Sequence, residues 1–471
     1  MTDLADLSAR ELAARIRRKE ISPVDAVRAA LARIEARRDL NAFITVVADQ
    51  ALDAARHAEQ QVMAGAALPP LHGVPYSVKD LTLTAGVRTT MGSAIYEQFV
   101  PKEDALPVAR AKAAGTILIG KTTTPEFGHK QGADAPIFGR TLNPIDPRFM
   151  CGASSSGAAV AVATGMGPVA LGTDGGGSIR IPASCCGIVG LKPTLGGVAN
   201  LQPPDLFAAN SYVGPMARDV ADTALLYEAI RGGDSRDPYG QAATPPGRAV
   251  PLTLSGLRVA WLPRCGNRLD PEVEAATTAA VRLMEREGAI VETIELDFVS
   301  LEQHFLVVLE SVLAARIGEQ LERFEARLDP SLVGTERRGR KHSAIALHEA
   351  GFARTRCFGQ LQGVFERFDV LVSPTVSAPP LPVEQDPNGI VTIAGEPAGT
   401  IRGAWYPYTY PMNLTGHPAL SMPCGKSRLG LPIGLQLAGR WHDDRFLLGV
   451  AALLEAGLQS SGGRHRLGPA P

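Results

Sequence analysis

The chain has 471 residues, of which 45% are hydrophobic and 20% charged, a composition that supports a sizeable folded core and argues against disorder. Its 47 basic and 48 acidic residues leave a formal net charge of −1. Because no basic surplus favours nucleic acid or an anionic membrane, neither partner is expected. We expect the partner to be a small molecule with little net charge.

Cysteine and histidine spacing gives no support for a metal site or a disulfide framework. No two of the six cysteines have C-x-x-C spacing, and the nine histidines contain no H-x-x-x-H pair. The first residues lack the basic start and apolar stretch of a secretory signal. The longest weakly polar run, residues 157–172, is too short to span a bilayer. These features predict a cytoplasmic protein that needs no metal or other cofactor.

The first 65 residues predict helices. Two of them lie within residues 8–38, and each begins at a serine with a capping pattern, Ser8 and Ser22. A third, alanine-rich helix is predicted over 48–65. We interpret this segment as a helical covering for a core that is made later in the chain.

From residue 71 onward, predicted strands alternate with predicted helices, which indicates an α/β layered protein. Strands are expected at 76–78, 115–122, 168–173, 257–262, 289–295 and 369–375, with a strand pair at 418–425 and 431–439. Helices are expected at 104–114, 157–165, 182–186, 216–230 and 271–287, with two more between 300 and 368.

Four parts of one large domain follow from this pattern. They are the helical covering (1–65), a core (66–230), a linker-like crossing loop rich in Gly, Pro and polar residues (231–256), and a C-terminal part with substrate-pocket loops (257–471).

The run GTILIGKT at 115–122 matches the phosphate-loop pattern G-x-x-x-x-G-K-[ST]. A phosphate-binding loop needs middle residues whose N–H groups converge on an anion. Here those residues are Thr116, Ile117, Leu118 and Ile119, which favour a buried strand. We therefore predict a strand rather than a nucleotide site.

Residues 150–190 carry two serine loops beside flexible backbone. Ser154, Ser155 and Ser156 lie in the first loop, and Ser178 directly follows three glycines in the second. A serine becomes a strong nucleophile only when a base accepts its proton. Lys79 ends a predicted apolar strand, and a lysine desolvated by apolar neighbours can act as that base. Taken singly, each serine loop could be a polar turn and Lys79 a solvated surface lysine.

Three segments together, GVPYSVKD, CGASSSG and GTDGGGSIRIPAS, resemble the motifs of the amidase signature family of Ser-Ser-Lys hydrolases. The resemblance continues in family order through GKTTTPEFG, GIVGLKPT, VGPMARDVAD, DVLVSPT and GLPIGLQLAG. It implies a single large α/β domain, with a mixed, twisted central β-sheet covered by α-helices on both faces. It also implies an amidase, a hydrolase of linear amide C–N bonds.

The resemblance assigns a role to each matching residue. Ser178 is the implied nucleophile, Ser154 the bridging serine that follows a cis Ala153–Ser154 peptide, and Lys79 the base. The implied oxyanion hole consists of the N–H groups of Gly175, Gly176, Gly177 and Ser178. We expect three residues to support these loops: Ser155, Asp174 and Arg180. Two positions depart from the family pattern, because Ala153 and Ser156 stand where glycine is more common.

The amide substrate is less well defined. One branch of the family, the glutaminase A subunit of tRNA-dependent amidotransferases, carries an aspartate before its N-L-A-G motif. The matching motif here is NLTG (413–416), and Tyr406 takes the place of the aspartate. Aromatic and apolar residues at Trp405, Tyr406, Leu206 and Phe207 favour a hydrophobic or aryl amide, with esters or carbamates as further substrates.

Several alternatives stay open. The aromatic residues could instead pack the core or a subunit contact. The protein could be the glutaminase subunit, or a family member that has lost activity and serves as a subunit. Whether it is a monomer or a homodimer is not decided by the sequence.

Overall fold

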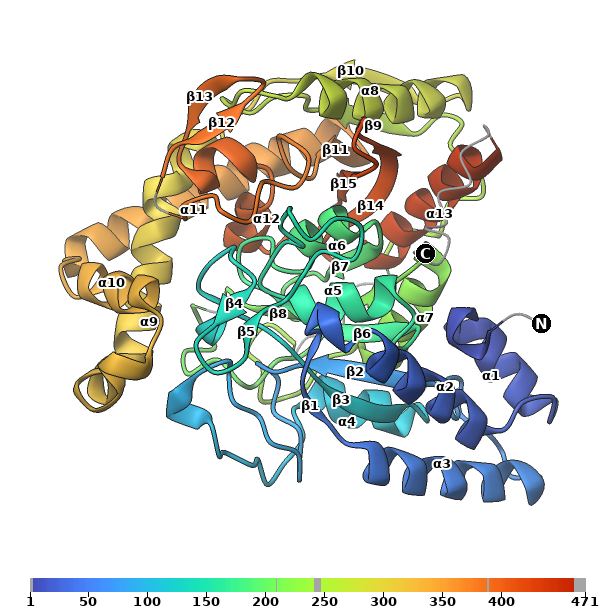
Figure 1. Cartoon of the computed structure of the whole chain (residues 1–471). Coiled ribbons are helices and arrows are strands. Elements are labelled where there is room, and N and C mark those ends of the chain that lie inside the picture. The colour runs from blue at the N-terminus through green and yellow to red at the C-terminus, as the bar shows by residue number, and fades with distance from the viewer. Residues whose placement is uncertain (1–2, 209, 241–246, 388, 461–471) are drawn as a thin grey trace.

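The computed structural model describes residues 3–208, 210–240, 247–387 and 389–460. Its centre is one mixed sheet of eleven strands (Figure 1), in the order β1-β3-β2-β6-β8-β7-β14-β15-β11-β9-β10. In that order they span Phe43–Val46, Ile117–Thr122, Pro75–Lys79, Val169–Asp174, Tyr212–Ala217, Val189–Lys192, Ala419–Lys426, Pro432–Ala438, Val370–Pro374, Arg258–Trp261 and Ile290–Thr293.

Helices cover both faces of this sheet, as the family resemblance implies. They are α1 (Ala9–Arg17), α2 (Pro23–Ala36), α3 (Ala48–Met63), α4 (Leu106–Ala113), α5 (Ser156–Ala163), α6 (Arg180–Cys186), α7 (Val220–Ile230), α8 (Pro271–Arg286), α9 (Glu302–Phe324), α10 (Pro330–Gly339), α11 (Ala344–Arg367), α12 (Tyr410–Thr415) and α13 (Asp444–Ser460). The expected α/β class is therefore confirmed.

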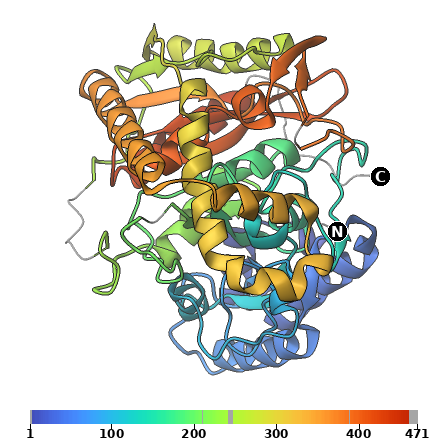
Figure 2. The ribbon, with the colours of Figure 1, turned by 90° about the vertical axis from the view of Figure 1, so that its left-hand side faces the viewer.

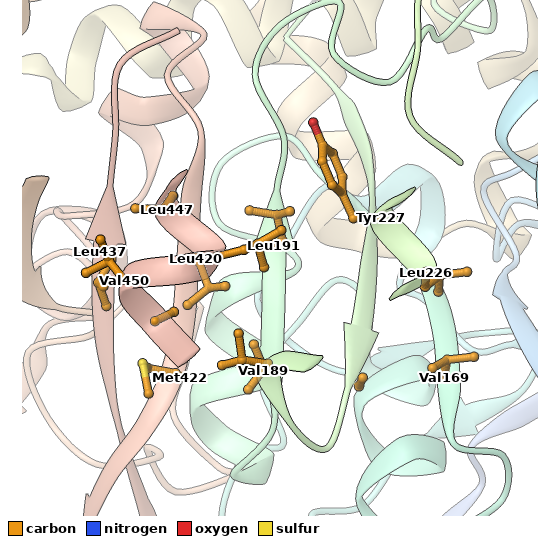
Figure 3. Packing of buried hydrophobic residues seen from close by; sticks show 14 of the residues in the cluster. Val169, Val189, Leu191, Leu226, Tyr227, Leu420, Met422, Leu437, Leu447 and Val450 are labelled. Carbon is orange, nitrogen blue, oxygen red and sulfur yellow. The ribbon is translucent and has the colours of Figure 1, made fainter. Parts of the chain in front are cut away.

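Strand β6 shows why both faces must be covered. Val169 and Leu171 belong to the large apolar cluster on the face of α7 and α13, whereas Ala170 packs on the opposite face with α5 and α6. Side chains alternate between the two faces of a strand, so a strand with apolar residues on both faces needs a layer on each side. Figure 3 shows the first cluster, in which residues of strands and helices meet.

The predicted N-terminal helices are confirmed as α1, α2 and α3. The Ser8 side chain accepts a hydrogen bond from the N–H of Glu11, and the Glu11 side chain reaches back to complete the capping box. The Ser22 side chain caps α2 by accepting from the N–H of Val24. The run 115–122 forms the buried strand β3, so the phosphate-loop match is a coincidence of sequence.

Two predicted elements are wrong. The helix expected at 216–230 is present but begins only at Val220, because Asp219 caps it and Met216 and Ala217 belong to strand β8. Between 300 and 368 there are three helices rather than two. Asp329 caps α10 and Ser343 caps α11, and each cap starts a new helix. These helices lie across one side of the sheet (Figure 2).

Several elements were not predicted from the sequence. They include strands β1, β7 and β8 of the central sheet and helix α12. They also include the hairpins β4–β5 (Asp134–Ala135, Gly139–Arg140) and β12–β13 (Val391–Ile393, Glu396–Gly399) and a π-helical turn, Ile401–Trp405. Of the predicted crossing loop 231–256, residues 241–246 lie outside the described part of the chain, and its remaining residues contain no helix or strand of the central sheet.

Candidate active site

The two serine loops and Lys79 meet at one edge of the sheet. Strands β2 and β6 are parallel neighbours, with Val78 opposite Leu171, so their carboxyl ends lie side by side. Strand β2 ends at Lys79 and β6 ends at Asp174, directly before the glycines that lead to Ser178. The carboxyl edge of parallel strands is where α/β proteins commonly place ligand sites.

Lys79 is fully buried and hydrogen-bonded to a serine. Its Nζ lies 2.7 Å from Ser154 Oγ and 3.3 Å from the carbonyl oxygen of Thr173. Burial lowers the pKa of Lys79 well below its ordinary value, and the negative charge of Asp174 offsets only part of this shift. A neutral amine in contact with a hydroxyl can accept its proton, which is the chemistry of a general base.

The first serine loop is packed tightly against its neighbours. The Ala153–Ser154 peptide is cis, as the family resemblance implies. Gly128 adopts a positive φ of 71°, and a Cβ at this position would lie 2.8 Å from Ser154 Oγ. Gly128 therefore lets the chain pass directly beside the Ser154 hydroxyl.

Ser155 joins the two serine loops. Its backbone N–H donates to the carbonyl oxygen of Ser178 at 3.0 Å, and its hydroxyl donates to the carbonyl oxygen of Thr173 at 3.0 Å. The same hydroxyl accepts from the Thr173 N–H at 3.2 Å. Each of these hydrogen bonds of Ser155 is made to backbone groups, as befits the expected supporting residue.

A buried ion pair holds the nucleophile loop. Arg180 and Asp174 are both fully buried, and Nε of Arg180 lies 2.9 Å from Oδ2 of Asp174. Burial alone would raise the pKa of Asp174, but the Arg180 guanidinium outweighs it and holds that pKa well below its usual range. The other Arg180 bonds reach Thr409, Asn413 and Gln436. The loop is thus anchored to segments more than two hundred residues away, because a buried charge needs several partners.

Asp174 also accepts a hydrogen bond from one of the backbone N–H groups expected to form the oxyanion hole. The N–H of Gly177 donates to Oδ1 of Asp174 at 2.6 Å. This bond leaves Gly177 the least able of the four predicted donors to bind a substrate oxygen. The N–H groups of Gly175, Gly176 and Ser178 therefore remain the expected donors of the oxyanion hole.

The two aromatic pocket candidates differ in their surroundings. Trp405 is fully buried in the second apolar cluster, and its Nε1–H donates to the carbonyl oxygen of Ala378 at 3.0 Å. Trp405 therefore packs the core, which is the alternative that the sequence left open. Tyr406 is buried closer to the serine loops, because its carbonyl oxygen accepts from the Thr409 hydroxyl, which also donates to the carbonyl oxygen of Gly176 at 2.7 Å.

Leu206 and Phe207 lie on a surface loop. Phe207 is 75% exposed and Leu206 is partly exposed. The loop contacts the site at its ends, where Asn210 donates to the carbonyl oxygen of Gly175 at 3.3 Å and Gln202 to that of Leu81 at 3.1 Å. Neither apolar side chain forms part of the buried site.

Two contacts of the serine loops were not predicted from the sequence. The Phe305 ring lies against Gly176, where a Cβ would approach it to 2.7 Å. The Gln131 side chain accepts from the N–H of Ala153 at 3.3 Å. Both residues come from segments without a catalytic motif, and only the proximity of Gln131 to the GKTTTPEFG run could have drawn attention to it.

A buried lysine hydrogen-bonded to a serine, beside a glycine-rich loop that carries a second serine, defines a candidate serine hydrolase. Comparison with known proteins agrees, because the Amidase family model matches residues 25–448. The chain belongs to the amidase signature family, whose members hydrolyse C–N amide bonds with a serine nucleophile in a Ser-Ser-Lys mechanism.

Similar proteins fall into two functional groups. The chain is 35% identical to the A subunit of the glutamyl-tRNA(Gln) amidotransferase from Geotalea daltonii, covering 96% of this chain and 97% of the relative. It is 34% identical to an acylamidase of Rhodococcus erythropolis, covering 96% and 95%. A bacterial aryl acylamidase of the family has a similar structure, with a TM-score of 0.89 at 28% identity over 99% of both chains.

Two kinds of feature are absent from the described residues. None of their helices is long and apolar enough to cross a membrane. No three of their His, Cys, Asp and Glu side chains form a group suited to a metal ion.

Proposed function

We propose that the protein is an amidase that hydrolyses a hydrophobic or aryl amide of a small molecule, with Ser178 as nucleophile, Ser154 as relay and Lys79 as base. The observation that carries the proposal is the 2.7 Å hydrogen bond between the buried amine of Lys79 and Ser154. The bond between Ser155 and Ser178 supports it, because it holds the second serine loop against the first.

The reaction has two halves. Ser178 Oγ attacks the amide carbonyl while its proton passes through the Ser154 hydroxyl toward Lys79, and the carbonyl oxygen takes up negative charge near the N–H groups of Gly175, Gly176 and Ser178. The C–N bond then breaks, and the same relay returns the proton to the leaving amine. Water next attacks the acyl-enzyme and gives its proton to the relay. The relay returns a proton to Ser178 Oγ as its bond to the acyl carbon breaks, which releases the carboxylic acid.

An apolar wall near the relay supports a hydrophobic substrate. A separate small cluster of buried apolar residues forms this wall. It contains Met91, Phe127, Leu313, Ile317 and Leu332, and Leu81 packs against it. Leu81 also lies close to Gly128, which borders Ser154. Apolar side chains this near the reacting groups favour apolar or aryl groups on the substrate. The similarity to an aryl acylamidase points in the same direction.

The similarity to the amidotransferase subunit supports a second candidate function, a glutaminase that works with partner subunits. Glutamine carries an ammonium group, which calls for a nearby carboxylate. Tyr406 stands at the position where that branch has its aspartate. Two charged side chains act on the Tyr406 hydroxyl, Arg402 and Glu302, and Arg402 has the larger effect on its pKa. Because a neutral tyrosine replaces the aspartate and its stronger charged neighbour is a cation, an ammonium group is disfavoured here, so we rank the amidase first.

Labelling with a serine-directed fluorophosphonate tests the nucleophile. We expect the wild type to be labelled and Ser178→Ala to remain unlabelled. A label of equal strength on the mutant would overturn the assignment.

Kinetics on anilides and glutamine tests the substrate class. Purified protein should hydrolyse anilides faster than glutamine. A strong preference for glutamine, with an activity that rises when a partner subunit is added, would favour the second candidate.

A further inference from the structure

Arg402 is a cation without an anionic partner among the described residues. It lies in the π-helical turn Ile401–Trp405, and its side chain is partly exposed. None of the ion pairs found in the described part of the chain includes it. Its Nε is buried without a hydrogen-bond acceptor there, and its Nη2 makes only a long contact of 3.5 Å with the carbonyl oxygen of His129.

Two separate chains of contacts connect Arg402 to the loop of the relay serine. His129 follows Gly128, the residue that passes directly beside Ser154 Oγ. On the other side, burial raises the pKa of Tyr406, and the charge of Glu302 adds to this shift. Interactions of the hydroxyl with Arg402 and with Gln131 partly offset it. Gln131 in turn binds the N–H of Ala153. Arg402 is therefore within reach of a molecule that lies at the Ser154 hydroxyl.

A buried N–H without an acceptor is uncommon and calls for an explanation. The guanidinium of arginine is a planar fork of donors whose geometry matches a carboxylate, and this pairing is stronger than a hydrogen bond between neutral groups. Glu302, a carboxylate whose charge also acts on Tyr406, accepts a hydrogen bond from Thr400 and forms no ion pair with Arg402.

We propose that Arg402 binds a carboxylate group of the substrate, so that the preferred amide carries an anionic group in addition to its apolar or aryl part. The inference rests on the proposed amidase function and narrows it. Arg402 is then a specificity-determining residue, and the apolar wall and the guanidinium select two different parts of one molecule.

Two matched pairs of amides test this inference. Butyryl 4-nitroanilide and succinyl 4-nitroanilide differ by a carboxylate on the acyl side, and butyryl anilide and 4-(butyrylamino)benzoate differ by one on the amine side. We expect the wild type to prefer the anionic member of one pair by about ten- to a hundredfold in kcat/KM, mainly through KM.

Arg402→Met should remove that preference, and Arg402→Lys should keep part of it. Arg445→Met is the control, because Arg445 is paired with Glu228 on another side of the molecule and its loss should leave the ratio unchanged. The ratio within a pair is the readout, so a general loss of activity cannot imitate the effect.

Hydrolysis without a carboxylate preference, or a preference that survives in Arg402→Met, overturns this inference alone. Hydrolysis of none of the four amides overturns the proposed amidase function and this inference with it.

Discussion

Two buried lysines on neighbouring strands of the sheet have different surroundings. Lys79 ends β2, and its amine contacts one hydroxyl and one carbonyl oxygen. Lys121 lies in β3 opposite Val78, so strand alternation places its side chain on the other face of the sheet. Its amine donates to Thr82, Thr84 and Thr89 and has Asp80 at 4.0 Å.

These surroundings set the chemistry that each lysine can perform. Burial lowers the pKa of Lys121 to about 8, partly offset by Asp80, whereas that of Lys79 falls well below its ordinary value. A lysine surrounded by oxygen acceptors keeps its proton and holds the fold together. A lysine with few acceptors and a serine beside it can lose its proton and act as a base.

The largest expected difference is in catalysis. Lys79→Met should lower kcat/KM by about 10⁴-fold, because the relay loses its base. Lys121→Met should lower it less than about tenfold per folded molecule, since its amine faces away from the serines. Kinetics on one anilide, with circular dichroism to check folding, measures both. An equal loss in both folded variants would contradict the comparison.

For the free energy of unfolding we expect the reverse order, with the larger loss in Lys121→Met. Lys121→Met leaves Asp80 and three oxygens without their cation, so we expect a loss of about 3–5 kcal/mol. Lys79→Met should not reduce the free energy of unfolding at neutral pH, because the folded state disfavours the ionised form of Lys79. Urea unfolding of the two variants against wild type measures the difference.

The pH dependence follows from the same shift. Ionised Lys79 cannot accept a proton, so kcat/KM should fall about tenfold per pH unit below its depressed pKa. The pKa of Lys79 in the folded state lies below its value of about 10.4 in the unfolded chain. Lys79 therefore lowers the free energy of unfolding at low pH, and this loss disappears as the pH rises toward the unfolded pKa. A pH–rate profile checks the acid limb. An acid limb with an apparent pKa near that of free lysine would contradict the assignment.

The smallest effect concerns a single acceptor of Lys121. Thr89→Val removes one hydroxyl bound at 2.9 Å, and we expect a loss of about 1–3 kcal/mol in the free energy of unfolding with activity unchanged within about twofold. Ser154→Ala is the matched change at Lys79 and should reduce activity far more than stability. Thermal unfolding measures the stability of both variants, and kinetics on one anilide measures their activity.

Local signals in the sequence were sufficient for much of the fold. Caps at Ser8 and Ser22 and the apolar run at 115–122 identified the first two helices and a buried strand correctly. Asp219 and Asp329 cap their helices in the same way, but the predicted helix boundaries do not follow these two caps. The serines and Lys79 were found because a motif surrounds them.

The contacts of the site could not be predicted in this way. Gln131 and Phe305 come from segments without a motif, and only the folded chain brings them to the serine loops, while Arg402 reaches the neighbouring His129. Trp405 and Tyr406 are neighbours in sequence and are buried in the same apolar cluster, yet only Tyr406 shares Thr409 with the glycine loop. Periodicity and composition do not distinguish such neighbours, because long-range packing decides their surroundings.

The anchoring of Arg180 has a consequence for biosynthesis. Lys79, Ser154 and Ser178 leave the ribosome long before Thr409, Asn413 and Gln436, which supply three of the acceptors of the Arg180 guanidinium. A nascent chain that ends before these residues holds all three proposed catalytic groups but cannot fasten the loop that carries Ser178. We therefore expect the loop that carries Ser178 to reach its final position only after α12 and β15 have been synthesised.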